Sequence, residues 1–392
     1  MKIEGPLTEE NLRAEVWPLF SRVLERSKRS IYLANHSLGR PLDRTADDIA
    51  AGLDAWYSGM NDAWEPWTAA MNRFRSLTAT LINAPRPDCI VLKTAAGQGL
   101  RAVLNALPGK PGVVATTGEF DSLDFILRVY RDKGRAGLTL VPARPDGRFY
   151  PDDIALAIKP GTALVLVSSV MFRTGQVLGG LPELVRKAHA AGAKVMVDVY
   201  HGAGVIPTDV QAVGTDFAVG GSYKYLRGGP GACWLYVRPD HLDTLRTLDT
   251  GWFAKRDVFS YERPEPPAYA PGGEGWNEST PPVLTPYQAL AGLEFTLAIG
   301  VERLRAYSLG QQHQLKKLLA QQGIEAEGAN TERGAFLTVR HPRAGDLAKA
   351  LDAHGVHTDA RGEYLRLCPD ILNPEAELAE AAARLGESAR KL

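Results

Sequence analysis

Between residues 89 and 237 the chain alternates short, almost continuous apolar runs with amphipathic segments of helical length. The runs are rich in β-branched residues: CIVLK (89–93), GVVAT (112–116), LTLVP (138–142), ALVLVS (163–168), KVMVD (194–198), DFAVG (216–220) and CWLYV (233–237). Strands that are apolar on both faces and separated by helices are typical of a mainly parallel sheet covered on both sides. The pattern predicts an α/β fold with a doubly wound, mainly parallel sheet.

The length of 392 residues is too great for one small core and predicts more than one folding unit. We expect an N-terminal helix and a substrate-side loop in residues 1–60, which join a smaller domain, and a large α/β domain in residues 61–285. The rest of the smaller α+β domain is expected in residues 286–392.

Local signals predict several elements outside the sheet. A helix from Thr8 to about Lys28 should be kinked at Pro18, and residues 32–67, rich in Asn, Gly, Pro and Trp, should be irregular. Thr285 and Gln288 resemble the capping box of a long helix. The C-terminal part is expected to contain strands at 335–340 and 364–367 and helices at about 343–354 and 374–391.

Charge and cysteine content exclude several classes of function. The 45 Lys and Arg balance the 45 Asp and Glu, so no overall field attracts nucleic acid or an acidic membrane. Cys89, Cys233 and Cys368 lie far apart, so neither a disulfide framework nor a metal site is expected. The start of the chain lacks an apolar signal-peptide core, and no stretch of 18 apolar residues occurs. We expect a cytoplasmic protein with a small neutral or zwitterionic substrate.

Two polar residues stand where strands of the predicted sheet end, which is where open α/β sheets bind ligands. Asp198 ends KVMVD and, taken alone, is also compatible with a turn or a helix cap. Lys224 follows the next strand in GGSYKYLRGGPG (220–231), whose five glycines allow close approach of a flat ligand. An aspartate that keeps a pyridine nitrogen protonated and a lysine that condenses with an aldehyde are what pyridoxal 5′-phosphate requires. We therefore predict this cofactor, held by Lys224 as a Schiff base.

The phosphate and the ring of such a cofactor need further contacts. Thr94 and Ala95 follow the first strand and open a helix, where backbone N–H groups and the Thr94 hydroxyl would hold an anion. A plain helix cap has the same geometry. Phe120, just after the second strand, is placed to stack on the cofactor, although a core position is almost as common for such a residue.

Over nearly its whole length the sequence resembles the kynureninase family, within the fold-type-I pyridoxal phosphate enzymes (the aspartate-aminotransferase-like fold) that include class-V aminotransferases and cysteine desulfurases. The motifs that carry the resemblance are YLANHSLGRPL (32–42), MFRTGQ (171–176), Asp198-x-x-His201, SYKYLRGGPG (222–231), GWF (251–253), STPP (279–282) and LRLCP (365–369).

The resemblance implies a role for each matching residue. Lys224 would also move the proton on the substrate's α-carbon, Asp198 would contact the pyridine nitrogen, and Tyr223 would donate a proton later. Ser37 and Arg366 would hold the α-carboxylate. The cofactor would further be contacted by Thr94, Ala95, Ser168, His201 and Tyr223 and, from the other subunit of a homodimer, by Trp252 and Thr280.

The implied reaction is hydrolytic Cβ–Cγ cleavage of L-kynurenine to anthranilate and L-alanine. An aminotransferase, a cysteine desulfurase, or a cofactor-binding protein without catalysis remains an alternative. Trp64 and Trp67 would either pack the substrate's aromatic ring or fill the core.

Three positions depart from the family pattern. Ala95 replaces a hydroxyl residue, and Asn35-His36 replaces Gly-Asn. Leu123 stands at an expected aspartate, unless a shift makes Asp124 its equivalent.

Overall fold

The computed structural model describes residues 4–28 and 30–392, so residues 1–3 and 29 of the first predicted unit lie outside the described part. A seven-stranded sheet forms its centre, in the order β2-β8-β7-β6-β5-β3-β4. All neighbours pair in parallel except β8, which is antiparallel to β2 and β7. The predicted mainly parallel sheet is confirmed. Its strands are β2 (Ile90–Lys93), β3 (Gly112–Thr116), β4 (Gly137–Val141), β5 (Thr162–Ser168), β6 (Lys194–Asp198), β7 (Phe217–Gly221) and β8 (Cys233–Val237).

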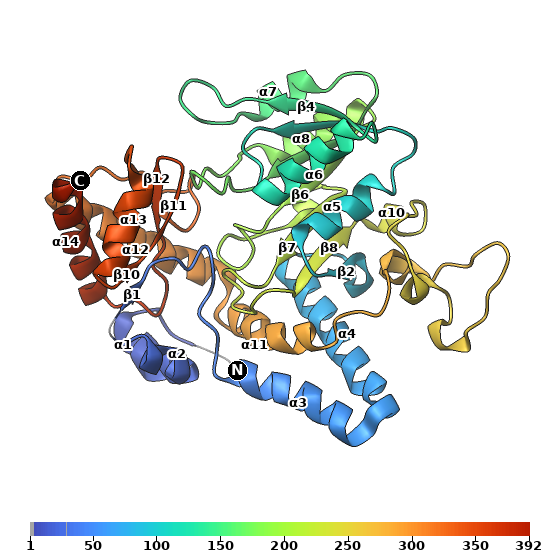
Figure 1. Ribbon diagram of the computed structural model, residues 1–392, viewed down its shortest axis with the longest axis horizontal. Helices are drawn as coiled ribbons and strands as arrows, with labels where there is room; N and C mark the ends of the chain where they lie inside the picture. The colour runs from blue at the N-terminus through green and yellow to red at the C-terminus, as the bar shows by residue number, and fades with distance from the viewer. Residues whose placement is uncertain (1–3, 29) are drawn as a thin grey trace.

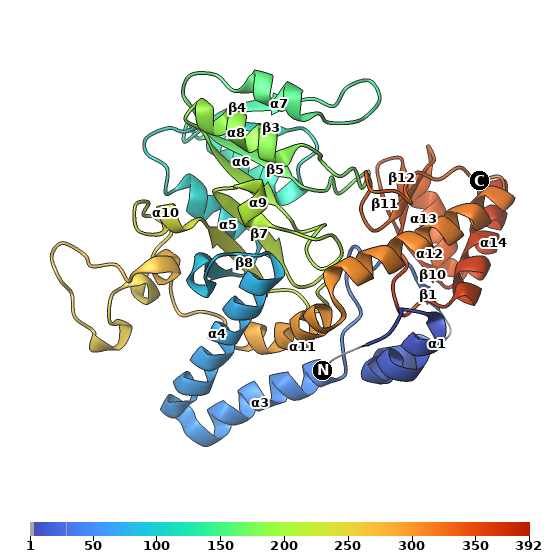
Figure 2. The same ribbon diagram turned by 180° about the vertical axis from the view of Figure 1, so that it is seen from behind.

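Helices cover both faces of this sheet. Figures 1 and 2, which view the molecule from opposite sides, show α5 and α6 over one face and α8 and α9 over the other. Central strand residues such as Val165, Val195 and Leu235 are fully buried between these layers. Burial on both faces explains why the strands are apolar without alternation. The helices are α5 (Ala96–Leu104), α6 (Asp121–Asp132), α7 (Pro151–Ala157), α8 (Leu181–Ala190), α9 (Val210–Val213) and α10 (Pro239–Leu242).

The prediction that residues 32–67 are irregular is wrong for most of this stretch. Helix α3 (Arg44–Gly59) and helix α4 (Trp64–Leu81) occupy it, joined by a 3₁₀ turn. Helix α3 packs against α11 (Leu284–Ile299) at Gly52, where an added Cβ would lie 3.0 Å from side-chain atoms of α11. The glycine therefore marks close helix packing rather than a loop.

The N-terminal segment is helical but discontinuous. Short α-helices, α1 (Glu9–Asn11) and α2 (Ser21–Arg26), flank a π-helical turn and a 3₁₀ turn that contains Pro18. The irregularity at Pro18 agrees with the predicted kink, but the single continuous helix that was predicted is not present. Phe20 packs edge-on against Phe295 of α11, with ring centroids 5.2 Å apart.

The C-terminal residues and the segment around Ile31 form a second core. The three-stranded antiparallel sheet has the order β11-β12-β9, and β1 pairs with β10 in parallel. Leu315, Leu347 and Leu365 lie in its hydrophobic cluster, which is distinct from that of the large sheet. The division at residues 60 and 285 stays a prediction. The elements are β1 (Ile31–Tyr32), β9 (Leu337–Arg340), β10 (Val356–His357), β11 (Asp359–Arg361), β12 (Tyr364–Leu367), α12 (Val301–Gln321), α13 (Ala344–Ala353) and α14 (Glu375–Lys391).

The capping box predicted at Thr285 is wrong. Helix α11 begins one residue earlier, and the Thr285 hydroxyl donates to the Pro282 carbonyl instead. The Gln288 amide donates to the carbonyls of Gly228 and Pro230, at 2.6 and 2.9 Å. Gln288 therefore fixes the glycine-rich loop after Lys224.

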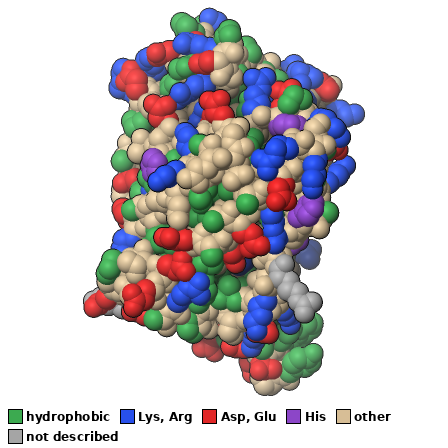
Figure 3. All heavy atoms as spheres, turned by 90° about the vertical axis from the view of Figure 1, so that its left-hand side faces the viewer, with side chains coloured by type: hydrophobic (Ala, Val, Ile, Leu, Met, Phe, Trp, Pro, Cys, Tyr) green, Lys and Arg blue, Asp and Glu red, His purple; other side chains and the backbone are tan. Residues whose placement is uncertain are grey.

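Acidic and basic side chains are intermixed on the face of the molecule seen in Figure 3, which is the side of α14. No helix in residues 4–28 and 30–392 combines the length and apolarity that crossing a membrane requires.

Candidate active site

Lys224 lies just beyond β7 and is 5% exposed. Its Nζ is 2.7 Å from Nε2 of His201. Burial lowers the pKa of the Lys224 amine to about 7, although the Asp198 carboxylate acts in the opposite direction. A substantial fraction of this amine is therefore neutral near pH 7, which a nucleophilic or proton-accepting lysine requires.

Three aromatic rings surround the amine. The centroids of Tyr200, Phe120 and Tyr223 lie 4.9, 5.4 and 5.5 Å from Nζ. Burial raises the pKa of the Tyr223 hydroxyl to about 12, so this group stays protonated at neutral pH. The surroundings of Lys224 are thus flat and largely apolar, with one phenol available as a proton donor.

Asp198 ends β6 beside Ser168 of β5, and it is buried. One of its oxygens accepts from the Tyr200 N–H at 2.8 Å, while no hydrogen bond from a described residue occupies the other. Burial raises the pKa of this carboxyl. No helix starts here, since α9 begins only at Val210, so the helix-cap interpretation fails. A buried carboxylate with a free oxygen is costly without a cationic partner.

His201 is buried next to Lys224, and its Nδ1 has no hydrogen-bond partner in the described part of the chain. Burial, and then the positive charge of Lys224, lower the pKa of His201 well below its usual range. The ring is therefore neutral.

Glu119 is a buried carboxylate that the sequence reasoning missed. The hydroxyls of Thr116 and Ser168 donate to its two oxygens, each at 2.6 Å. Burial raises the pKa of Glu119 to about 7, and the neighbouring charge of Asp198 adds to the effect. Glu119 follows the carboxyl end of β3, just as Asp198 lies at the carboxyl end of β6, and this position in the sequence could have identified it as a site residue.

The segment that follows Glu119 places Leu123 and Asp124 differently. Leu123 is fully buried in the core, whereas Asp124 accepts a hydrogen bond of 2.6 Å from Arg128 along helix α6. The second Asp124 oxygen is buried without a hydrogen-bond partner in the described part of the chain, and the shift that would make Asp124 the equivalent residue stays a prediction.

Thr94 and Ala95 lie exposed at the start of α5. Ala95 is the N-cap residue and supplies no side-chain hydrogen bond. The N–H and hydroxyl of Thr94 both donate to the Gln98 side chain, at 2.8 and 3.2 Å. Gln98 therefore occupies both Thr94 donors, and the first backbone N–H groups of α5 are the donors that this end of the helix offers to an anion.

The structure brings Ser37 and Arg366 together, and adds Asp359 between them. Arg366 Nε donates to Asp359 at 2.7 Å, and Nη2 contacts both the second Asp359 oxygen and, at 3.4 Å, the Ser37 hydroxyl. The remaining nitrogen, Nη1, donates to the Phe172 carbonyl. Asp359 faces Arg366 across the β11–β12 pair, and that register was not evident from the sequence.

Trp252 and Thr280 lie together but share no described contact with the residues around Lys224. Trp252 Nε1 donates to the Thr280 hydroxyl at 3.1 Å. Figure 1 shows their segment, in gold, extending outward beyond α10. Trp64 packs on Phe253 of this segment, with ring centroids 5.6 Å apart. Trp67 is buried and donates to the Gly52 carbonyl, so it fills the core between α3 and α4.

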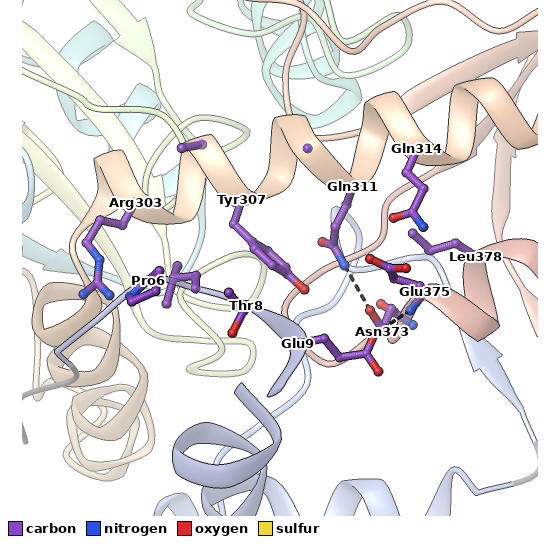
Figure 4. Close-up of a pocket in the computed structure, with 13 residues that line it drawn as sticks. Pro6, Thr8, Glu9, Arg303, Tyr307, Gln311, Gln314, Asn373, Glu375 and Leu378 are labelled. Atoms are coloured by element: carbon purple, nitrogen blue, oxygen red, sulfur yellow. Dashed lines mark hydrogen bonds between the residues drawn. The ribbon is translucent and has the colours of Figure 1, made fainter. Parts of the chain in front are cut away.

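A separate open groove lies between the N-terminal segment and α12 (Figure 4). Its polar groups include Gln311, which donates to the Asn373 carbonyl at 3.0 Å. None of the residues predicted to form the site lines this groove.

The arrangement around Lys224 fits pyridoxal 5′-phosphate. Lys224 is a buried amine with a lowered pKa, and Asp198 presents a free oxygen that a protonated pyridine nitrogen would satisfy. The unpartnered Nδ1 of His201 and the first backbone N–H groups of α5 fit the remaining polar groups of such a ligand.

The chain is also similar to known proteins. The family model "Aminotransferase class-V" matches residues 45–368. A kynureninase from Bacillus cereus is 30% identical over 374 residues, covering 90% of this chain and 86% of the relative. A kynureninase from Pseudomonas fluorescens is 28% identical over 350 residues, covering 84% and 82%. The solved structure of C-DES with glycine covalently linked to its pyridoxal phosphate cofactor has a TM-score of 0.85 at 18% identity, covering 94% of this chain and 98% of that chain. That likeness shows a shared fold.

Proposed function

This chain belongs to the class-V aminotransferase family, is kynureninase-like and uses pyridoxal 5′-phosphate, and we therefore propose that it hydrolyses L-kynurenine to anthranilate and L-alanine. The observation that carries the proposal is the similarity to kynureninases over 90% of the chain. The buried pair of Lys224 and Asp198 supports it further.

In this proposal Lys224 and Asp198 serve the cofactor. Lys224 holds it, and Asp198 keeps its ring nitrogen protonated. When bound, the cofactor delocalises the negative charge that develops at the substrate's α-carbon. The Lys224 amine moves the proton at that carbon, since its pKa of about 7 is close to the operating pH.

Other residues would orient the substrate and complete the reaction. Arg366 and Ser37 hold the α-carboxylate, and water adds to the γ-carbonyl carbon before the Cβ–Cγ bond breaks. Tyr223, protonated because its pKa is raised to about 12, would protonate the β-carbon, which keeps the electron pair of the broken bond, so that L-alanine can form.

We also propose that the active unit is a homodimer. Trp252 and Thr280 bind each other, and neither shares a hydrogen bond or ring contact with Lys224 among the described residues. In the dimer they would complete the phosphate site of the other subunit. The exposed position of Thr94 and Ala95 is compatible with a site that a second subunit covers.

A cysteine desulfurase is less well supported, because that reaction needs an accessible thiolate. Cys368 is buried at the end of the small sheet, where its thiol donates to the Ala335 carbonyl, and burial raises its pKa strongly. Burial likewise raises the pKa of Cys89 and of Cys233 to about 11.

The test is anthranilate fluorescence from L-kynurenine, measured with and without added pyruvate or 2-oxoglutarate. We expect anthranilate in both conditions and none with the Lys224→Ala variant. If turnover of kynurenine requires the keto acid, the enzyme is an aminotransferase. If a reducible, bound cofactor gives no anthranilate in either condition, the substrate is another amino acid.

A further inference from the structure

The Asp359 carboxylate is the centre of a hydrogen-bonded cluster at the junction of the two cores. It accepts from His36 Nε2 at 2.8 Å and from Arg366 Nε at 2.7 Å, as well as from Arg366 Nη2 and the Ser37 hydroxyl. Arg361 lies further out, with a nitrogen 3.6 Å from Asp359. His36 and Arg366 are buried, and Asp359 is half-buried.

The charges of this cluster are well defined. Burial alone would raise the pKa of Asp359, but the hydrogen bonds from His36 and Arg366 hold it well below its usual range. Burial lowers the pKa of His36 to about 4, so its ring is neutral at pH 7. Because Asp359 is ionised and accepts only, the His36 proton must lie on Nε2. The cluster is therefore a carboxylate held by one neutral imidazole, one hydroxyl and one guanidinium.

Some N–H donors of the Arg366 guanidinium are occupied by protein groups, and the others could bind a ligand. A guanidinium has five N–H donors in a rigid fork. Asp359 occupies the edge formed by Nε and one Nη2 proton, and the Phe172 carbonyl takes one proton of Nη1. One proton on each of Nη1 and Nη2 is then left over. Their one described partner is the Ser37 hydroxyl, at a long 3.4 Å.

We propose that Asp359 is a positioning residue, which holds one edge of the Arg366 guanidinium so that the other edge binds the substrate's α-carboxylate. This inference rests on the proposed use of Arg366 as the carboxylate site. Two parallel N–H donors match a carboxylate bidentately, and Ser37 lies next to them. His36, which departs from the family pattern, becomes the residue that fixes Asp359.

The test separates recognition of the carboxylate from the rest of ligand binding. L-Alanine and ethylamine differ by one carboxylate, and their binding to the holoenzyme can be measured by titration calorimetry without any turnover. In the Asp359→Ala variant we expect L-alanine to bind about 10- to 100-fold more weakly, the range for lost charge-assisted hydrogen bonds. Ethylamine should change by less than about 2-fold, because it does not use Arg366.

Two further variants make the result specific. Asp359→Asn keeps the shape and one acceptor oxygen, so it should fold and show an intermediate loss. The double variant Asp359→Ala/Arg366→Ala should bind L-alanine no more weakly than Arg366→Ala alone, because residues that act through one another are not additive. The matched control is Asp352→Ala, which removes an exposed aspartate paired with His357 and should leave both ligands unaffected.

Other outcomes would overturn the inference. Equal weakening of L-alanine and ethylamine would show that Asp359 is structural only. Unchanged or tighter binding of L-alanine in Asp359→Ala and Asp359→Asn would show that Asp359 competes with the ligand for Arg366. Neither binding measurement involves kynurenine. Failure to cleave kynurenine would therefore refute the proposed reaction, whereas only the binding of L-alanine and ethylamine decides the role of Asp359.

Discussion

Replacing Glu119 with glutamine should stabilise the cofactor-free protein, and only at higher pH. Glu119 is buried at 3% exposure, and its pKa is raised from 4.5 to about 7, mainly by burial. A folded-state pKa above the unfolded value means that ionisation penalises folding. The penalty is absent below about pH 4.5, grows as the pH rises toward 7, and is complete above 7. A rise of this size corresponds to about 3 kcal/mol.

Glutamine removes the ionisable group and nearly keeps the shape of the protonated acid, although its amide must donate to a hydroxyl from which the carboxylate accepts. That change in hydrogen bonding does not depend on pH, so the difference in stability near pH 5 serves as the reference. Relative to it, the Glu119→Gln variant should gain about 3 kcal/mol of stability at pH 8, since it retains the neutral form. Urea unfolding of both proteins at the two pH values measures the difference, and titrating groups that do not interact with Glu119 cancel because both chains share them. A difference that does not depend on pH, or a wild type that is more stable at pH 8, would refute a raised pKa at Glu119.

Three predictions concern the proposed reaction. Asp198→Asn should slow anthranilate formation by several orders of magnitude while the unfolding midpoint changes little, and a rate near that of the wild type would make Asp198 a turn residue only. Arg366→Ala should raise KM for L-kynurenine more than it lowers kcat, because a carboxylate clamp acts in both ground and transition states; a loss confined to kcat would contradict this role. Mixing inactive Lys224→Ala with inactive Thr280→Ala should restore part of the activity through hybrid dimers, whereas a fully active monomer in sedimentation would rule out shared sites.

The large sheet could be predicted from the sequence because its central strands, such as β6 and β7, are buried on both faces and are therefore apolar. The reversed direction of β8 was not predictable, since an apolar run such as CWLYV carries no sign of the direction of its partners. Helix α3 was not predicted because glycine and tryptophan residues in this stretch are also common in loops. Only the structure shows that Gly52 allows close packing of α3 against α11.

Some residues of the candidate site could likewise be predicted from the sequence, and others could not. Asp198 and Lys224 could be proposed because strand ends are recognisable along the chain. Glu119 and Asp359 could not, since their importance arises from tertiary contacts. The buried carboxylate of Glu119 accepts a hydrogen bond from Ser168 on β5, a strand far away in the sequence. Asp359 contacts Arg366 because the register of the β11–β12 pair places them opposite each other.

Borohydride reduction of the holoenzyme, followed by tryptic peptide mapping, tests most directly whether Lys224 carries the cofactor. Trypsin does not cleave at a modified lysine, and no other lysine or arginine lies between Lys194 and Arg227. The reduced cofactor should therefore appear on one uncut peptide, residues 195–227, with the modification at Lys224. Modification of Lys93, the other lysine that is buried in the described part of the chain, would contradict the assignment. Normal cleavage after Lys224 in a fully reduced, cofactor-loaded sample would contradict it equally.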